Sequence, residues 1–152
     1  MPLAVDGMVT MLEIEKTLFL ESLTNLIARL VYIRRLERMW QLIENDYADP
    51  ALTLEKAALA SGINKNHLNV LLRQTTTFTC HQLLTRYRVL KAVGMMSAKD
   101  YNLLEIALHN GFGSLNTFER NFRCLLGTTP KDFKAQSRFL RANSKLAEMM
   151  SE

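Results

Sequence analysis

Apolar side chains in the first third of the chain recur at helical spacing. At intervals of four, three, four and three residues come Phe19, Leu23, Leu26, Leu30 and Ile33. This is the spacing of a heptad seam along one side of a helix. We therefore expect a helix from about Leu12, after a loose start of some ten residues. Its seam faces either the protein's own domain or a second copy of the chain.

A second amphipathic segment follows the seam, which is interrupted at Glu37. The apolar positions on one side of this segment are Leu36, Met39, Trp40 and Ile43. The residue before a proline disfavours helical backbone, so we expect the segment to end near Asp49 and Pro50. Residues 1–36 are thus predicted to be an N-terminal helical segment that precedes a separate domain.

After Pro50 one pattern of apolar and polar positions occurs twice. Residues 53–58 align with 102–107 at an offset of 49, and the offset becomes 50 from Leu68 and Phe118 onward. Two copies of one supersecondary unit are the economical explanation of this repeat.

Each copy carries the start and stop signals of helices. N-cap residue types stand at Thr53, Asn64, Thr79, Asn102, Ser114 and Thr129. Glycines that accept a left-handed turn follow the helices at Gly62, Gly111 and Gly127. Thr77 stands where the second copy has Gly127, and because a β-branched residue is costly in that conformation we expect the first turn to be remodelled. A short helix, a turn and a capped second helix form the helix-turn-helix pattern.

These signals predict an all-α fold of two helix-turn-helix subdomains joined by a long linker helix. The domain is expected over 37–140, followed by a tail over 141–152. Its parts are the first helix-turn-helix at about 53–77, the linker helix at about 79–98, the second helix-turn-helix at about 102–127 and a closing helix at about 130–137.

Composition and charge narrow the function. The chain has 152 residues, 48% of them apolar, with a net charge of +4. Residues 51–152 hold fourteen basic and seven acidic residues, whereas residues 1–50 hold five and eight. A basic C-terminal part suggests either a polyanion such as nucleic acid or a solvated surface. Two cysteines far apart and the lack of a membrane span or secretory signal indicate a cytoplasmic protein.

Catalytic and metal-binding patterns are not found. His67, His81 and His109 lack ligand spacing with one another and with the cysteines, so we expect no metal site. No glycine-rich phosphate loop occurs, and Ser114 is explained as a helix cap. The sequence therefore predicts a protein that is not an enzyme and needs no cofactor.

The stretch "IALHNGFGSLNTFERNFRCLLGTTPKDFKAQ" from Ile106 to Gln136 resembles the signature of the AraC/XylS transcription regulators. The positions that match are Ile106, Ala107, Gly111, Phe112, Ser114, Phe118, Arg120, Phe122, Arg123, Gly127, Thr129, Pro130 and Phe133. The resemblance covers about residues 37–137. It implies a promoter-binding regulator with two recognition helices in successive major grooves, acting through RNA polymerase.

The resemblance also implies which residues touch DNA. Base contacts are expected from Asn66, Asn69, Val70, Leu115, Asn116, Thr117 and Arg120. Phosphate contacts are expected from Lys65, His67, Arg73 and Arg123. Arginine can pair with guanine, asparagine with adenine, and apolar side chains with a thymine methyl group. Arg120 has a structural alternative, an ion pair with Glu119 or Asp132, and Glu119 is expected to point away from the phosphates.

Other interpretations stay open. About 35 residues precede the resemblance, so the chain is either a small stand-alone regulator or the C-terminal part of a longer one. In the second case residues 12–33 resemble the helix that often helps such regulators to form homodimers. The alternative function is a protein-interaction module that acts on another regulator through this N-terminal helix and binds DNA weakly.

Overall fold

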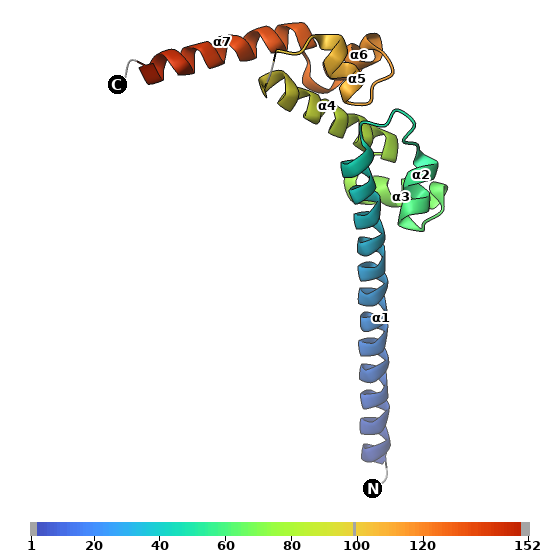
Figure 1. Ribbon diagram of the computed structural model, residues 1–152. Coiled ribbons are helices and arrows are strands. Elements are labelled where there is room, and N and C mark those ends of the chain that lie inside the picture. Colours follow the sequence, from blue (N-terminus) through green and yellow to red (C-terminus); the bar gives the residue numbers. More distant parts are fainter. Residues whose placement is uncertain (1–2, 99, 150–152) are drawn as a thin grey trace.

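The chain is all-α, as the sequence predicts. The computed structural model describes residues 3–98 and 100–149, with side chains over 13–97 and 100–145. Within this part of the chain there are seven helices and no strand (Figure 1). The helices are α1 (Leu3–Asp46), α2 (Leu54–Ser61), α3 (Lys65–Thr76), α4 (Cys80–Ala98), α5 (Leu103–His109), α6 (Leu115–Leu126) and α7 (Pro130–Met149).

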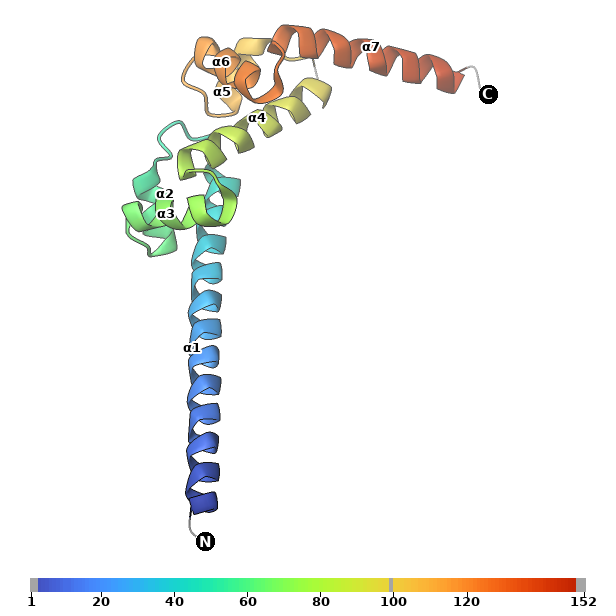
Figure 2. The same cartoon turned by 180° about the vertical axis from the view of Figure 1, so that it is seen from behind.

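The first helix is longer than predicted at its N-terminus. The prediction of some ten loose residues at the start is wrong, because α1 begins at Leu3. The helix ends at Asp46, a few residues before the predicted end near Asp49. Its last turns pack on the first helix-turn-helix unit through the buried side chains of Met39 and Ile43. The rest of α1 projects from the body as a long rod (Figures 1 and 2).

Helices α2 and α3 form the first helix-turn-helix unit, with the predicted caps. The Thr53 hydroxyl accepts the N–H of Lys56, and the Asn64 side chain accepts the N–H of Asn66 at 3.0 Å. Gly62 ends α2 in the left-handed conformation, with φ +65°. The buried side of the unit consists of Ala57, Ala58, Ile63, Leu68 and Leu72.

Helices α5 and α6 form the second unit. The predicted capping box is present: Asn102 and Glu105 each accept the other's backbone N–H, at 2.8 and 3.0 Å. Ser114 caps α6, and Asn110 rather than Gly111 caps the end of α5, with Gly111 next in the chain at φ +79°. The buried side of this unit consists of Ile106, Ala107, Phe112, Phe118 and Phe122, with phenylalanine at three positions where the first unit has isoleucine or leucine.

The turn after α3 keeps the geometry of the turn after α6, so the remodelling expected from Thr77 is wrong. Thr77 has φ +66°, and its N–H donates to the Arg73 carbonyl at 3.1 Å. Gly127 has φ +70° and makes the equivalent bond to Arg123 at 2.9 Å. The Thr76 hydroxyl braces the first turn, since it donates to the Leu72 carbonyl at 2.7 Å and accepts the N–H of Phe78 at 3.2 Å.

The linker helix α4 begins after the predicted cap at Thr79 and contributes to both cores. Its first half buries Cys80 and Leu84 in the first unit, and burial raises the pKa of the Cys80 thiol. Its second half buries Val89, Ala92 and Met96 in the second unit. The units are therefore held together by a shared helix and not by a free linker.

A buried arginine fixes the junction between the units. Arg88, on α4, donates from Nε to the Tyr47 carbonyl at 2.7 Å and from Nη2 to the Asp49 carbonyl at 2.8 Å. Gly111 packs against the same two groups, since a Cβ atom at this position would lie 2.5 Å from the Tyr47 carbonyl oxygen and 2.9 Å from Arg88 Nε. The turn of the second unit thus packs directly against the loop that follows α1.

The last helix extends well past the predicted closing helix at 130–137. Near its start, Lys134 donates to the Tyr101 carbonyl and Arg138 pairs with Asp100. Arg141 donates to the Met96 carbonyl at 3.1 Å, at the C-terminal end of α4. Several basic residues of the C-terminal part are therefore used to hold α7 on the body. No described helix is both long and apolar enough to span a membrane.

Candidate nucleic-acid interface

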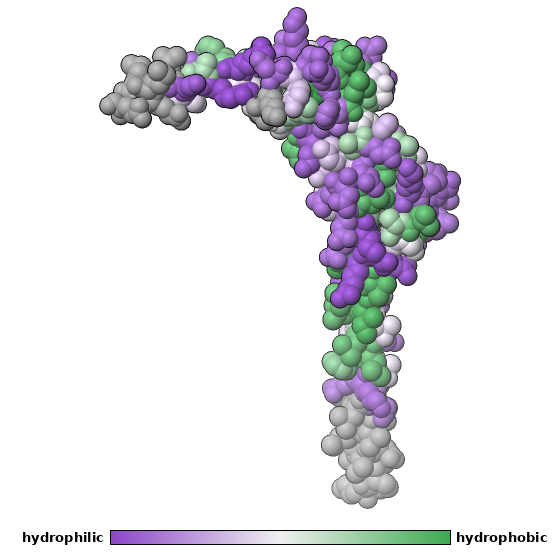
Figure 3. All heavy atoms as spheres, in the orientation of Figure 1, coloured by the Kyte–Doolittle hydropathy of each residue, from purple (hydrophilic) through white to green (hydrophobic). Residues whose placement is uncertain are grey.

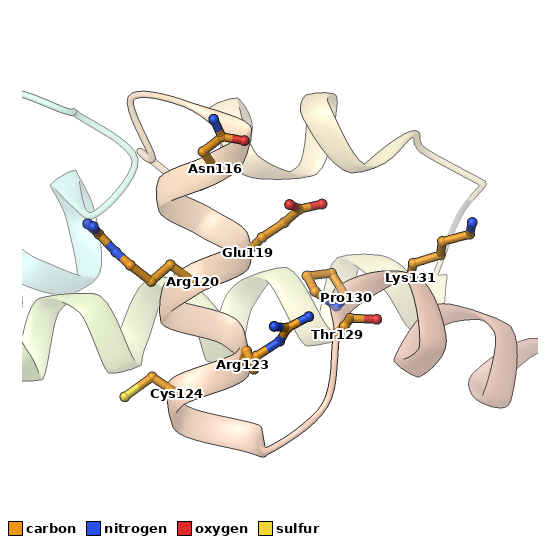
Figure 4. A pocket seen from close by; sticks show the side chains of 8 residues that line it. All are labelled: Asn116, Glu119, Arg120, Arg123, Cys124, Thr129, Pro130 and Lys131. Atoms are coloured by element: carbon orange, nitrogen blue, oxygen red, sulfur yellow. The ribbon is translucent and has the colours of Figure 1, made fainter.

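One side of α6 is an exposed, polar face that no other helix covers. Phe118 and Phe122 are completely buried on the opposite side. Because a helix turns every 3.6 residues, Asn116, Arg120 and Arg123 fall together on the outer side. They line an open groove that runs from α6 to the start of α7 (Figure 4).

Both arginines of this groove are available to a ligand. Of the described residues none forms an ion pair or a hydrogen bond with the side chain of Arg120 or Arg123. The structural alternative for Arg120 is not realised, since Arg120 and Glu119 point in different directions (Figure 4). Asp132 instead accepts the Thr129 hydroxyl at 2.6 Å.

The flanks of the α6 face are less free than its centre. Leu115 is half-buried against the second core, and the Thr117 hydroxyl accepts a hydrogen bond from Ser114 at 3.0 Å. Of the four base contacts expected on this helix, Asn116 and Arg120 therefore present the most accessible polar atoms.

Two charged residues of the groove, Glu119 and Lys131, are not among the DNA contacts expected from the sequence. Glu119 lines the same groove as Asn116 and points toward the start of α7, where its position relative to a phosphate backbone stays a prediction (Figure 4). Lys131 also lines the groove, at the N-terminal end of α7, and sequence reasoning missed it. The signal was present, because a lysine directly after a helix-starting proline stands at a positive helix end where anions bind.

Some of the residues of α3 expected to contact DNA instead make contacts within the protein. Lys65 forms an ion pair with Glu55 at 3.4 Å. The ring of His67 lies edge-on to Tyr32 of α1, with 5.8 Å between ring centroids. Val70, which is exposed, is the counterpart of Arg120 and offers only an apolar contact.

Asn69 shows why α3 differs from α6. Its side-chain oxygen accepts the backbone N–H of Cys80 at 3.1 Å, at the first residue of α4. The equivalent residues in the second unit are Glu119 and Pro130, and proline has no N–H to satisfy. An asparagine that reads adenine uses both its oxygen and its nitrogen, so the bond to Cys80 removes half of that function from Asn69.

Free polar side chains on α3 remain at its two ends. The Asn66 side chain is exposed, as is that of Arg73, the counterpart of Arg123. Neither side chain has a partner within the described part of the chain. Among the described residues there is no cluster of three or more metal-ligating side chains.

Comparison with known proteins agrees with this geometry. The model of a family described as a helix-turn-helix domain matches residues 57–136. PqrA of Proteus vulgaris, named a probable transcription factor, is 32% identical over 83 residues, which are 55% of this chain and 68% of PqrA. The chain belongs to the AraC/XylS family. Its domain is that of a DNA-binding transcriptional regulator, and these similarities do not favour a protein-interaction module.

Other AraC/XylS members extend the comparison. The transcriptional activator RhaS of Salmonella arizonae is 28% identical over 100 residues, which cover 66% of this chain and 36% of RhaS. The chain thus spans about a third of that relative's length. The DNA-binding domain of AdpA, solved in complex with a target DNA, superposes with a TM-score of 0.65 at 25% identity, over 71% of this chain and 96% of that domain.

Proposed function

We propose that this regulator reads promoter DNA chiefly through α6, with α3 as a weaker second reader. The observation that carries the proposal is the exposed row of Asn116, Arg120 and Arg123, whose side chains have no partner among the described residues. Arg120 suits a guanine and Asn116 an adenine in the major groove. Arg123, nearer the end of the helix, suits a phosphate, which positions the protein without reading sequence.

The contribution of α3 is smaller in this proposal. Asn66 and Val70 remain as base contacts, Arg73 as a phosphate contact, and Asn69 is mainly a link to α4. For Lys65 and His67, phosphate contacts compete with an ion pair to Glu55 and a ring contact to Tyr32. Support for a double-stranded target comes also from the related AdpA domain, which was solved with its target DNA.

The deciding experiment is selection of binding sites from a randomised duplex pool at two salt concentrations. We expect a strong block of conserved bases read by α6 and a weaker block roughly 34 Å away along the duplex, one helical turn on. Affinity should fall steeply with salt, because phosphate contacts release counterions. Retention that is weak, insensitive to salt and without sequence enrichment would contradict the proposal.

Alkylation of Cys124 tests directly whether DNA binds to the α6 face of the protein. Its thiol is exposed in the α6 groove, whereas Cys80 is buried. Bound duplex should therefore slow alkylation of Cys124 by iodoacetamide, with Cys80 unreactive in both states. Unchanged alkylation of Cys124 at saturating DNA would place the contact on another face.

We further propose that promoter binding leads to recruitment of RNA polymerase, which the family resemblance implies. A reporter transcribed in vitro by purified polymerase, with and without the chain, tests this step. Because recruitment follows binding, a chain that binds its selected site yet leaves transcription unchanged would remove only this part of the proposal.

A further inference from the structure

A groove lies where α1 meets the first helix-turn-helix unit. Exposed apolar side chains of α1 gather along its middle, clear of the compact body (Figure 3). Nearer the body, α1 instead forms one wall of the groove, and α3 and α4 form the rest. The apolar part of the lining consists of Leu36, Met39, Trp40, Leu72 and Leu83. Three helices from different parts of the sequence therefore meet around one open space.

The groove has the size and lining of a small-molecule site. Met39 and Leu72 are each 2% exposed and lie at its base, whereas Leu36 and Leu83 are half-buried. Its volume of about 550 Å³ is in the range of sites for drug-sized ligands. The lining residues of α1 span 33–44, which is about 16 Å at 1.5 Å per residue. One elongated small molecule fills this length.

Trp40 presents a fixed aromatic ring in the groove. Its ring packs edge-on against Tyr87 of α4, with 5.3 Å between centroids, and Tyr87 packs in the same way against Tyr47 at 5.3 Å. Such ring pairs hold the indole in one orientation. Trp40 is nevertheless 38% exposed. The face of an indole attracts a cation, so Trp40 suits a ligand that carries positive charge next to an apolar body.

Two carboxylates give the groove a negative charge. Glu37 and Glu44 line it and are exposed. No described residue forms an ion pair or a hydrogen bond with either side chain. Of the described residues that line the groove none is basic, since Arg34 and Arg38 lie on an adjacent surface of α1. The charge that complements this lining is therefore positive.

The spacing of the two carboxylates sets the length of the ligand. Glu37 and Glu44 are seven residues apart, so they lie within about 20° of each other around α1 and about 10 Å apart along it. Trp40 lies between them on the same side of the helix. A ligand with a positive group at each end and an apolar middle would match all three side chains.

We propose that this groove binds an elongated apolar dication. Each cationic group lies at one of the two carboxylates, and the apolar chain lies over Trp40, Leu36 and Leu83. The ligand touches α1, α3 and α4 at once, so it stabilises the packing of these helices. Any ligand that binds only the folded protein raises its melting temperature.

The groove is separate from the DNA-reading side of α3. Leu72 and Thr76, which line the groove, lie more than about 100° around α3 from the middle of the row Asn66, Val70 and Arg73. A molecule in the groove therefore leaves that row free. This inference does not depend on which bases the protein reads.

The fluorescence of Trp40 tests the proposal in the full chain without DNA. Trp40 is the one tryptophan of the sequence, so its emission reports on the groove alone. The probe is octamethonium chloride, in which eight methylene groups join two trimethylammonium groups. We expect a saturable change in emission and a melting temperature that rises with octamethonium concentration. Suberate, a dianion of similar length, and tetramethylammonium, a cation without the chain, should produce neither effect.

Removal of the carboxylates tests the contacts of the two cationic groups. Glu37→Gln and Glu44→Gln should each weaken octamethonium binding about threefold, as expected for exposed ion pairs. Together they should weaken it about tenfold. Asp46→Asn is the matched control, because it removes an exposed carboxylate about 160° around α1 from Glu44. We expect less than a twofold change in this control.

A charge added to the α3 wall tests the site from the other side. Thr75→Lys places a positive charge in the groove, whereas Gln74→Lys places it on the adjacent, outer side of α3. Both residues are exposed, so neither change disturbs the core. We expect at least a fivefold loss of octamethonium affinity for Thr75→Lys and less than a twofold loss for Gln74→Lys. Equal losses would place the bound dication outside the groove.

Other outcomes would also overturn the proposal. Emission and melting temperature that do not respond to millimolar octamethonium would show that the groove takes no such ligand. Equal responses to suberate would show that charge does not select the ligand. Binding that is undiminished in the double Glu37→Gln, Glu44→Gln variant would exclude the two carboxylates. Each of these results leaves the proposed function intact, because DNA site selection is measured without the dication.

Discussion

The two helix-turn-helix units share a backbone and differ in what their recognition helices, α3 and α6, leave free. In both units a polar side chain caps the start of the recognition helix, and a residue in the left-handed conformation follows its end. In α3, however, the polar side chains Lys65 and Asn69 bind protein groups. In α6, Arg120 and Arg123 have no partner among the described residues.

One cause of this difference lies in the helices that follow the recognition helices. The first residue of α4 is Cys80, whose N–H needs an acceptor, and Asn69 supplies it. The first residue of α7 is Pro130, which has no N–H, so the facing residue of α6 is released from that task. Equivalent positions of the two units thus have different tasks, because Asn69 bonds the next helix and Glu119 does not.

The largest expected effect comes from adding a methyl group at the turn of one unit only. In Gly111→Ala the new Cβ would lie 2.5 Å from the Tyr47 carbonyl oxygen, which is backbone and cannot move away easily. The position also has φ +79°. We expect a loss of about 3 kcal/mol in the free energy of unfolding, from overpacking and strain together. Urea denaturation measures it.

Gly62→Ala is the matched control in the other unit. Gly62 has φ +65° but nothing within 4 Å of an added Cβ. Only the left-handed conformation is penalised there, at about 1–2 kcal/mol. Equal losses for the two variants would mean that the junction of Gly111, Arg88 and the loop after α1 does not hold the units together.

The second prediction compares base reading by equivalent residues. Arg120→Ala should cost about 1–3 kcal/mol in binding to the selected site and relax preference at one base pair. Val70→Ala removes only a small apolar contact, and we expect a change below about 0.5 kcal/mol, as for surface substitutions in general. Equilibrium titrations on the selected duplex and on single-base variants measure both. A larger loss for Val70→Ala would make α3 the main reader.

The third prediction concerns phosphate contacts. Arg123→Ala should weaken binding to all duplexes by a similar factor and reduce the slope of log affinity against log salt by about 1. Arg73→Ala, the matched change on α3, should also weaken binding to all duplexes and reduce the salt dependence if the first unit contacts the DNA phosphates. Loss of preference at one base pair in Arg123→Ala would show that this arginine reads sequence.

Local features of the fold were predictable from sequence because their partners are close in the chain. Each predicted N-cap at Thr53, Asn64, Asn102 and Ser114 bonds a backbone N–H within three residues. The repeat then gave the order of the helices. The all-α class and the family follow from these local signals together with the quoted signature.

Contacts between distant residues were not predictable in the same way. Arg88 and the Tyr47 carbonyl are 41 residues apart, and no pattern marks an arginine that binds carbonyls. The bond from Asn69 to Cys80 depends on the packing of α3 against α4, so the sequence placed Asn69 among the base contacts. The base and phosphate roles of the site residues remain predictions until DNA binding is measured.

The smallest expected effect is that of Thr77→Gly, which tests how the turn after α3 forms without a glycine. Thr77 carries a β-branched side chain at φ +66°, where Gly127 in the second unit has none. Thr77→Gly relieves about 1–2 kcal/mol of strain and loses roughly 0.5–1 kcal/mol to the greater freedom of the unfolded chain. We expect a net gain of about 0.5–1 kcal/mol by thermal unfolding, with DNA binding unchanged. A loss of stability would instead mean that the Thr77 side chain stabilises the turn. The Thr76 hydroxyl, which bonds the Leu72 carbonyl and the Phe78 N–H, also stabilises this turn, and Thr76→Ala measures that second contribution separately.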